Sequence, residues 1–225
     1  MKIAVLGTGM VGRALAARLS GLGHDVTIGT RDPAATLART EPDGMGNPPF
    51  STWASEHTAV RLAPLAEAAA EAELIVNAAN GSGALPALEQ AGADHLVGKV
   101  LIDISNPLDF SQGFPPTLFV KDTDSLGEQI QRAFPNARVV KTLNTMNANL
   151  MVDPASLGAE SSVFISGNDA DAKTAVTELL ASFGHTDIID LGDISTARGT
   201  EMLLPVWLRL MGALDTAAFN FKIVR

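Results

Sequence analysis

Short aliphatic runs alternate with segments of helical periodicity along most of the chain. Residues 2–6 are aliphatic after Lys2, which is the pattern of a strand buried on both faces of a parallel sheet. Val11, Leu15 and Leu19 then recur at helical spacing, and residues 25–28 form a second strand-like run. The first thirty residues therefore predict a strand, a helix over 11–22 and a second strand, joined by a right-handed crossover.

The alternation continues toward the C-terminus. Further strands are predicted over 58–62, 74–78, 100–104, 137–141, 162–166 and 186–190, and further helices over 64–72, 84–91, 126–134 and 169–183. We expect a long loop over 39–57, an extended surface path over 106–123 and an irregular connection over 142–161. This alternation is typical of α/β proteins. We predict one domain over 1–225, a Rossmann-type, doubly wound, mostly parallel sheet with a C-terminal helical elaboration.

The C-terminal elaboration is predicted from residues 196–221, which are apolar on nearly every face of a helix. The large apolar side chains are Met202, Leu203, Leu204, Val206, Trp207, Leu208, Leu210 and Met211. A helix of this kind has to be buried. Because the sheet already has covering helices, we expect the 196–221 helix to pack against a second copy of the chain, which makes the protein a homodimer.

The composition is that of a packed globular protein. Hydrophobic residues make up 46% of the 225 residues and charged residues 18%, which argues against chain-wide disorder. No apolar run approaches the roughly 20 residues of a membrane span, so we expect no membrane association. The absence of cysteine excludes disulfides, thiolate metal sites and a cysteine nucleophile, and it is typical of a chain in the reducing cytoplasm. Since His24, His57, His95 and His185 share no ligand spacing, we expect no metal.

The net charge of −9 makes the protein as a whole repel nucleic acid, which we do not expect as a partner. An anionic ligand therefore needs a local positive site. Such a site follows the first predicted strand, where the motif G-x-G-x-x-G leads into the first predicted helix. Its three glycines allow a tight turn, close approach of a pyrophosphate and close packing of the helix on the strand. We assign dinucleotide binding to Gly7, Thr8, Gly9, Met10, Val11 and Gly12, whose free N–H groups lie at the positive end of the helix dipole.

The end of the second predicted strand indicates which dinucleotide is bound. An NAD enzyme commonly has an acidic residue there to bind the ribose hydroxyls, whereas this chain has Thr30 and Arg31. An arginine at this place pairs with a 2′-phosphate and stacks on adenine, which favours NADP. Asp32 is an alternative ligand of the ribose, but Asp32 followed by Pro33 is also typical of a helix N-cap with proline at the first helical position.

Asparagines follow several of the later strands, at the carboxyl edge where open α/β sheets bind ligands. Asn77, Asn80, Asn106 and Asn144 are our candidates for holding the nicotinamide end of the cofactor. The alternative is that these side chains only stabilise turns and hydrogen-bonded strand exits.

The sequence offers no acid–base set from which to name a catalytic residue. It has no Ser-His-Asp order and no G-x-S-x-G motif, and without tyrosine it has no Tyr-Lys proton relay. Hydride transfer between two bound cofactors needs positioning more than proton transfer, and it is therefore compatible with this absence.

These residues resemble a known family, the coenzyme F-420-dependent NADP oxidoreductases, which are also similar to the cytoplasmic domain of the STEAP metalloreductases. The resemblance covers nearly the whole chain and is carried by residues 3–12, 29–31, 140–145 and 197–201. It implies a dimer that binds NADP across the sheet edge and passes hydride directly to a stacked deazaflavin. The 39–57 segment and the loop around Pro115 are longer than in the compact archaeal members of the family, and such segments can reshape the pocket of the second cofactor. We therefore keep both coenzyme F-420 and a flavin as candidate co-substrates.

Two other functions remain as alternatives. The first is an NADP-sensing dimer without turnover. The second is an NADP-dependent dehydrogenase of a small carbonyl or imine, which needs a proton donor. Lys141 and His57 are the candidates for that donor.

Overall fold

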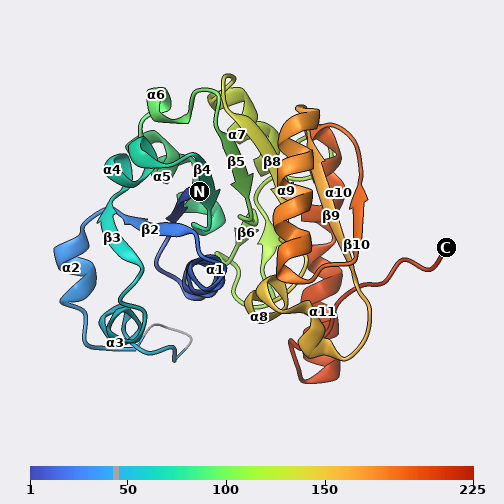
Figure 1. The fold of residues 1–225 in the computed structure, drawn as a ribbon. Helices are drawn as coiled ribbons and strands as arrows, with labels where there is room; N and C mark the ends of the chain where they lie inside the picture. Colours follow the sequence, from blue (N-terminus) through green and yellow to red (C-terminus); the bar gives the residue numbers. More distant parts are fainter. Residues whose placement is uncertain (43–45) are drawn as a thin grey trace.

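The computed structural model describes residues 1–42 and 46–225 and contains the predicted α/β fold (Figure 1). Its first unit consists of β1 (Lys2–Leu6), α1 (Met10–Gly21) and β2 (Asp25–Thr30), within about one residue of the predicted bounds at most ends. β1 pairs in parallel with both β2 and β4 (Leu74–Asn77), so the first strand lies in the interior of the sheet. This position explains why the first strand is aliphatic on both faces.

The main sheet has eight strands in the order β10-β9-β8-β5-β4-β1-β2-β3. The remaining strands are β3 (Arg61–Pro64), β5 (Val100–Asp103), β8 (Arg138–Thr142), β9 (Ser162–Gly167) and β10 (Asp187–Asp190). All neighbouring pairs are parallel except β8 and β9. The chain order reverses between β1 and β4, and the carboxyl ends of β1, β2, β4, β5 and β8 meet at one edge. Open α/β sheets bind ligands at such a switch point.

Helices cover both faces of this sheet. One hydrophobic core packs α1, α8 (Ala148–Val152) and α9 (Ala170–Phe183) on the sheet. A second core packs α4 (Leu65–Glu71), α5 (Gly81–Ala91), α6 (Ala93–Leu96) and α7 (Leu126–Ala133) on the opposite face. The layers are therefore helix, sheet and helix, which confirms the Rossmann-type fold.

The prediction of a loop over 39–57 is wrong for part of that segment, because α3 (Phe50–Glu56) lies within it. Phe50, Trp53 and Ala54 have helical spacing, and Phe50 is buried in the same core as α1. This helix is only seven residues long and its surroundings are rich in proline and glycine, so its periodicity is hard to recognise. Residues 43–45, also in the predicted loop, lie outside the described residues.

A single helix over 196–221 is also wrong. The structure has α10 (Ala197–Met202), then α11 (Leu204–Leu214), and residues 216–225 contain neither helix nor strand. Pro205 explains the break because it has no N–H to donate to the carbonyl of Glu201. Leu204 and Leu208 are the fully buried residues of α11, so this helix is buried on one side rather than all round.

Smaller differences concern strand bounds and connections. β3 begins three residues later than predicted, and the connection over 142–161 contains α8 and a short 3-10 helix, Pro154–Leu157. The path over 106–123 is extended as predicted and includes a two-stranded ribbon of β6 (Leu108–Asp109) and β7 (Thr117–Leu118). α2 (Pro33–Leu37) follows β2 directly. None of the helices in the described part of the chain has the length and apolar character that crossing a membrane requires.

Candidate functional site

The glycine-rich loop joins β1 to α1 and has little space at two of its glycines. Gly7 has φ +133°, and a Cβ there would lie 2.7 Å from the carbonyl oxygen of Ala78. A Cβ on Gly12 would lie 2.1 Å from the carbonyl oxygen of Gly7. Both positions therefore require glycine for the turn and for the close packing of α1 on β1, as the motif predicts.

Gly9 differs from these two glycines, because a Cβ built on it would meet no atom within 4 Å. It is the N-cap residue of α1, and no side chain caps that helix. The N–H groups of the first turn, at Met10 and Val11, lie beside this open space. An uncapped helix N-terminus next to a glycine has the geometry that a pyrophosphate requires, so the loop fits the predicted dinucleotide.

The residues at the end of β2 are those for which the sequence predicts contact with an adenosine ribose. Thr30 is held by its side-chain oxygen, which lies 3.0 Å from that of Thr36. Arg31 is exposed, and within residues 1–42 and 46–225 its guanidinium has no partner. Asp32 caps α2 by accepting a hydrogen bond of 2.9 Å from the N–H of Ala35. The carboxylate of Asp32 is therefore used as a helix cap, and Arg31 is available to an anion.

The predicted asparagines divide into an inner and an outer set. Asn77 is fully buried and donates a hydrogen bond of 2.9 Å to Asp103. Asn80 caps α5 by accepting from the N–H of Gly83 at 2.8 Å. Beyond the ends of β5 and β8, the side chain of Asn106 donates to the backbone carbonyl oxygen of Asn144, and the side chain of Asn144 donates to the Oδ1 of Asn106, both at 3.0 Å. We call these two residues the asparagine pair; Asn144 is buried and Asn106 is half-buried. The pair places two amide groups at the carboxyl edge, whereas Asn77 supports the edge from inside.

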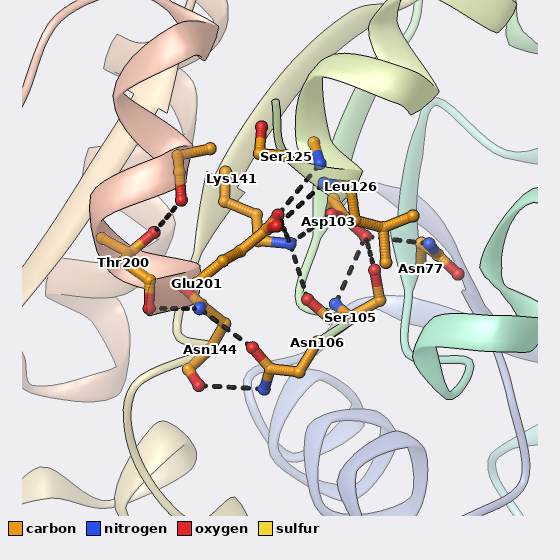
Figure 2. Close-up of polar contacts among 12 residues, drawn as sticks. Asn77, Asp103, Ser105, Asn106, Ser125, Leu126, Lys141, Asn144, Thr200 and Glu201 are labelled. Atoms are coloured by element: carbon orange, nitrogen blue, oxygen red, sulfur yellow. Dashed lines mark hydrogen bonds and ion pairs between the residues drawn. The ribbon is translucent and has the colours of Figure 1, made fainter. Parts of the chain in front are cut away.

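Beneath the asparagine pair lies a buried charge network of Asp103, Lys141 and Glu201 (Figure 2). The Nζ of Lys141 lies 2.7 Å from Asp103, 2.8 Å from Glu201 and 2.6 Å from the carbonyl oxygen of Ser105. All three side chains are at most 1% exposed. Burial alone lowers the pKa of Lys141, but the two carboxylates outweigh burial and hold that pKa above its usual value. Lys141 is therefore a buried ammonium with three acceptors.

Glu201 connects this network to two helices. It extends from α10 and accepts hydrogen bonds of 2.8 and 3.0 Å from the N–H groups of Leu126 and Gly127, at the start of α7. One turn away, Arg198 donates two hydrogen bonds to Glu128, which lowers the pKa of that carboxyl. Asn144 also donates to the carbonyl oxygen of Thr200 at 3.1 Å. α10 is thus bonded to the start of α7 and to Asn144 after β8 (Figure 2).

Sequence reasoning did not identify Asp103 and Glu201 as partners of Lys141. The available signal was a charged residue inside each of two aliphatic strands, Asp103 in β5 and Lys141 in β8, since buried charges are normally paired. These two strands are neighbours and place Asp103 opposite Lys141 in register. Glu201, in a separate helix, could be recognised only once the fold was known.

The two candidate proton donors have different surroundings. Lys141 has no exposed surface and its donors are used by buried acceptors. His57 ends α3, where its Nδ1 lies 2.8 Å from the carbonyl oxygen of Trp53 and its ring stacks on the Trp53 ring at 4.3 Å. In the described part of the chain, no group of three His, Cys, Asp or Glu side chains is arranged to hold a metal ion.

Comparison with known proteins agrees with this geometry. A family model described as NADP oxidoreductase, coenzyme F-420-dependent, matches residues 2–107. The F-420-dependent NADP reductase of Methanothermobacter marburgensis is 28% identical over 214 residues, which cover 93% of this chain and 92% of that protein. The metalloreductase STEAP3 of Rattus norvegicus is 30% identical over 211 residues, but the chain spans only 38% of its length.

The structural comparison extends over the whole chain. A crystal structure from Arthrobacter sp. FB24, provisionally named an F-420-dependent NADP-reductase, has 66% sequence identity and a TM-score of 0.96, and the match covers 100% of both chains. The glycine-rich loop and the family match therefore lead to the same result. The chain belongs to the coenzyme F-420-dependent NADP oxidoreductase family and is an NADP-dependent oxidoreductase.

Proposed function

We propose that the protein transfers hydride between NADPH and the deazaflavin of coenzyme F-420, or a flavin-type acceptor. The observation that carries the proposal is the composition of the carboxyl edge. The two uncharged side-chain amides of the asparagine pair lie at this edge. In the described part of the chain, the charged groups next to the pair are Asp103, Lys141 and Glu201, which are buried and paired with one another. Such an edge is suited to orienting two rings rather than to moving protons.

The path of NADP follows from the residues already placed. Arg31 binds the 2′-phosphate, the loop around Gly9 binds the pyrophosphate, and the asparagine pair orients the nicotinamide. When bound, NADPH and the acceptor supply the hydride chemistry. Asn80 lies between the loop and the pair along this path, and Asn77 contributes by fixing Asp103 beneath it.

A groove at the C-terminal helices is our candidate for the acceptor site. A cavity of about 360 Å³ lies between the 115–121 segment and the C-terminal helices, a volume typical of small-molecule sites. Two of its lining residues belong to segments that lead to the site: Leu118 pairs with Leu108, two residues beyond Asn106, and Met202 follows Glu201 in the chain. Lys121 and Arg209 also line the groove, where they are suited to an acceptor that carries a phosphate.

The acceptor is tested by measuring NADPH oxidation against coenzyme F-420, FMN, FAD, ferric chelates and small carbonyls. We expect the fastest turnover with the deazaflavin or a flavin. With stereospecifically deuterated NADPH, the label should reach C5 of the reduced deazaflavin without exchange with water. Turnover restricted to small carbonyls, or no turnover with any acceptor, would contradict the proposal.

Arg31 is expected to determine the preference for NADP. Arg31→Ala should weaken NADP binding by roughly 2 kcal/mol, about thirty-fold, because a charge-assisted contact with the 2′-phosphate is lost, and it should hardly change NAD binding. Calorimetric titration measures both affinities. Arg61→Ala is the control, because Arg61 pairs with Asp25 and Glu71 at the start of β3. Equal losses for NADP and NAD in Arg31→Ala would contradict this role.

We also propose that the C-terminal region, residues 196–221, forms a homodimer contact. Several large apolar side chains of α11 and of the 110–119 segment are exposed: Phe110, Phe114, Phe119, Val206 and Leu214. Such exposed apolar side chains are typical of protein interfaces. Light scattering at micromolar concentration should give twice the 23.4 kDa of one chain. A mass of one chain under these conditions would rule the dimer out.

A further inference from the structure

A cavity of about 490 Å³ lies between the first turn of α1 and residues 38–42 and 48–50; we call it the Arg39 cavity. It opens beside Thr8 and Gly9, the part of the loop to which we assign the pyrophosphate. The other residues that line it are Arg13, residues 38–42 and residues 48–50. The dinucleotide motif does not account for these residues, yet their cavity adjoins the expected path of the adenosine half of NADP.

Arg13 holds one wall of this cavity in place. Its Nε donates to the carbonyl oxygen of Thr8 at 2.8 Å, and an Nη donates to that of Pro48 at 2.6 Å. The same guanidinium lies 5.4 Å from the centre of the Phe50 ring, and Phe50 is buried against α1. Residues 48–50 are therefore fixed to the first turn of α1 and form a wall beside the glycine-rich loop.

Arg39 lies on another wall of the cavity and is chemically different from Arg13. It is exposed, and its guanidinium has no hydrogen-bond or ion-pair partner among residues 1–42 and 46–225. The contact of Arg39 with Ser51 involves the backbone and not the guanidinium: the hydroxyl of Ser51 donates a hydrogen bond of 3.4 Å to the carbonyl oxygen of Arg39. Glu41 also lines the cavity, but no ion pair joins it to Arg39. In a chain of net charge −9, an unpaired arginine in a cavity is a local positive site.

Arg31 and Arg39 flank the same short helix. Arg31 precedes α2 and Arg39 follows it, and the five residues of α2 span about 7.5 Å at 1.5 Å per residue. The bond between Thr36 and Thr30 fixes this helix to the end of β2. Two long arginine side chains on either side of one short helix can reach the same phosphate group, and two guanidiniums match the charge of a phosphate monoester better than one.

We propose that Arg39 is a specificity-determining residue that binds the 2′-phosphate of NADP together with Arg31, with the phosphorylated ribose at the mouth of the Arg39 cavity. The inference rests on the NADP binding of the proposed function and assigns a role to the residues directly after α2. It predicts a ligand preference that the glycine-rich loop alone cannot produce, because the loop contacts a pyrophosphate that NAD also carries.

The test uses nucleotide fragments that separate the two phosphate positions. Calorimetric titrations with NADP, NAD, 2′-AMP and 5′-AMP are compared for the wild type, Arg39→Gln and Arg39→Lys. We expect Arg39→Gln to weaken NADP and 2′-AMP about ten-fold and to leave NAD and 5′-AMP within about two-fold. Arg39→Lys should recover most of the loss because it keeps the charge. Arg225→Gln is the matched control, since it removes an exposed arginine at the C-terminus, far from α2 (Figure 1).

Each contrary result has a distinct meaning. Unchanged NADP affinity in Arg39→Gln, or equal losses for NADP and NAD, would overturn the role of Arg39 and leave the proposed hydride transfer intact. A wild type that binds NADP through both arginines but reduces no acceptor would remove the proposed acceptor and leave the role of Arg39 intact. A wild type that binds neither dinucleotide would overturn both proposals.

Discussion

Lys141→Ala is expected to lower the free energy of unfolding by about 3 to 5 kcal/mol, because it leaves buried carboxylates without their cation. Asp103 and Glu201 approach Lys141 within 2.8 Å, and all three side chains are at most 1% exposed, so bulk water does not solvate the two carboxylates. A loss of this size is a large part of the 5 to 15 kcal/mol that usually stabilises a domain. Urea unfolding followed by circular dichroism measures it.

Lys99→Ala is the control for Lys141→Ala. Lys99 is half-buried and donates to the carbonyl oxygens of Ala69 and Ala70, with no carboxylate involved. Its removal should lower the free energy of unfolding by about 1 kcal/mol. Similar losses for both variants would show that the buried network does not need its cation.

The pH dependence gives a second check on Lys141. Its pKa is raised in the folded state, so its contribution to stability is present below the unfolded value of about 10.4 and is lost as pH rises through the folded pKa. The difference between wild type and Lys141→Ala should therefore not shrink between pH 6 and pH 8. A difference that disappears between these values would mean that the lysine is neutral in the folded protein.

Gly9→Val is expected to leave the fold intact and to weaken NADP binding on the order of a thousand-fold, about 4 kcal/mol. The valine side chain meets no protein atom near its Cβ, so it occupies the open space beside the first turn of α1. A pyrophosphate displaced from that turn loses several charge-assisted hydrogen bonds, each worth about 1.5 to 3 kcal/mol. Fluorescence titration with NADPH measures the affinity, and circular dichroism checks the fold.

Two other glycines of α1 separate ligand exclusion from damage to the protein. Gly21→Val makes the same substitution at the opposite end of the helix, also in open space, and should not affect NADP. Gly12→Val should destabilise the fold, because its Cβ would lie 2.1 Å from a backbone oxygen. Retention of NADP binding by Gly9→Val would mean that the pyrophosphate does not pass over this loop.

The fold was predicted where local pattern determines structure. The first strand, helix and strand follow from aliphatic runs and helical spacing, and both core faces support them. The prediction failed at α3, whose apolar spacing covers only one turn beside prolines, and at the C-terminus, where Pro205 divides an apolar segment into two helices. A hydrophobic pattern describes which residues prefer burial, but it does not describe where the backbone loses a hydrogen bond.

The candidate site divides in the same way. The glycines of the loop and Arg31 stand at fixed offsets from the first two strands, so their places could be predicted. The asparagines were found as candidates, but the sequence could not show that Asn77 and Asn144 are buried, whereas Asn106 is half-buried. The contacts of Lys141 with Glu201 and of Arg13 with Pro48 join segments that only the folded chain brings together.

The bond between Glu201 and Lys141 has a consequence for the order in which the protein folds during synthesis. Lys141 and Asp103 leave the ribosome well before Glu201, yet the amides at the start of α7 also depend on the Glu201 carboxylate. Until α10 emerges, β5, β8 and α7 can pack together only if the ammonium of Lys141 and the first N–H groups of α7 lack the acceptor that Glu201 provides. The nascent chain therefore completes this half of the sheet after translation has passed residue 201, and it is most exposed to chaperones and proteases until then.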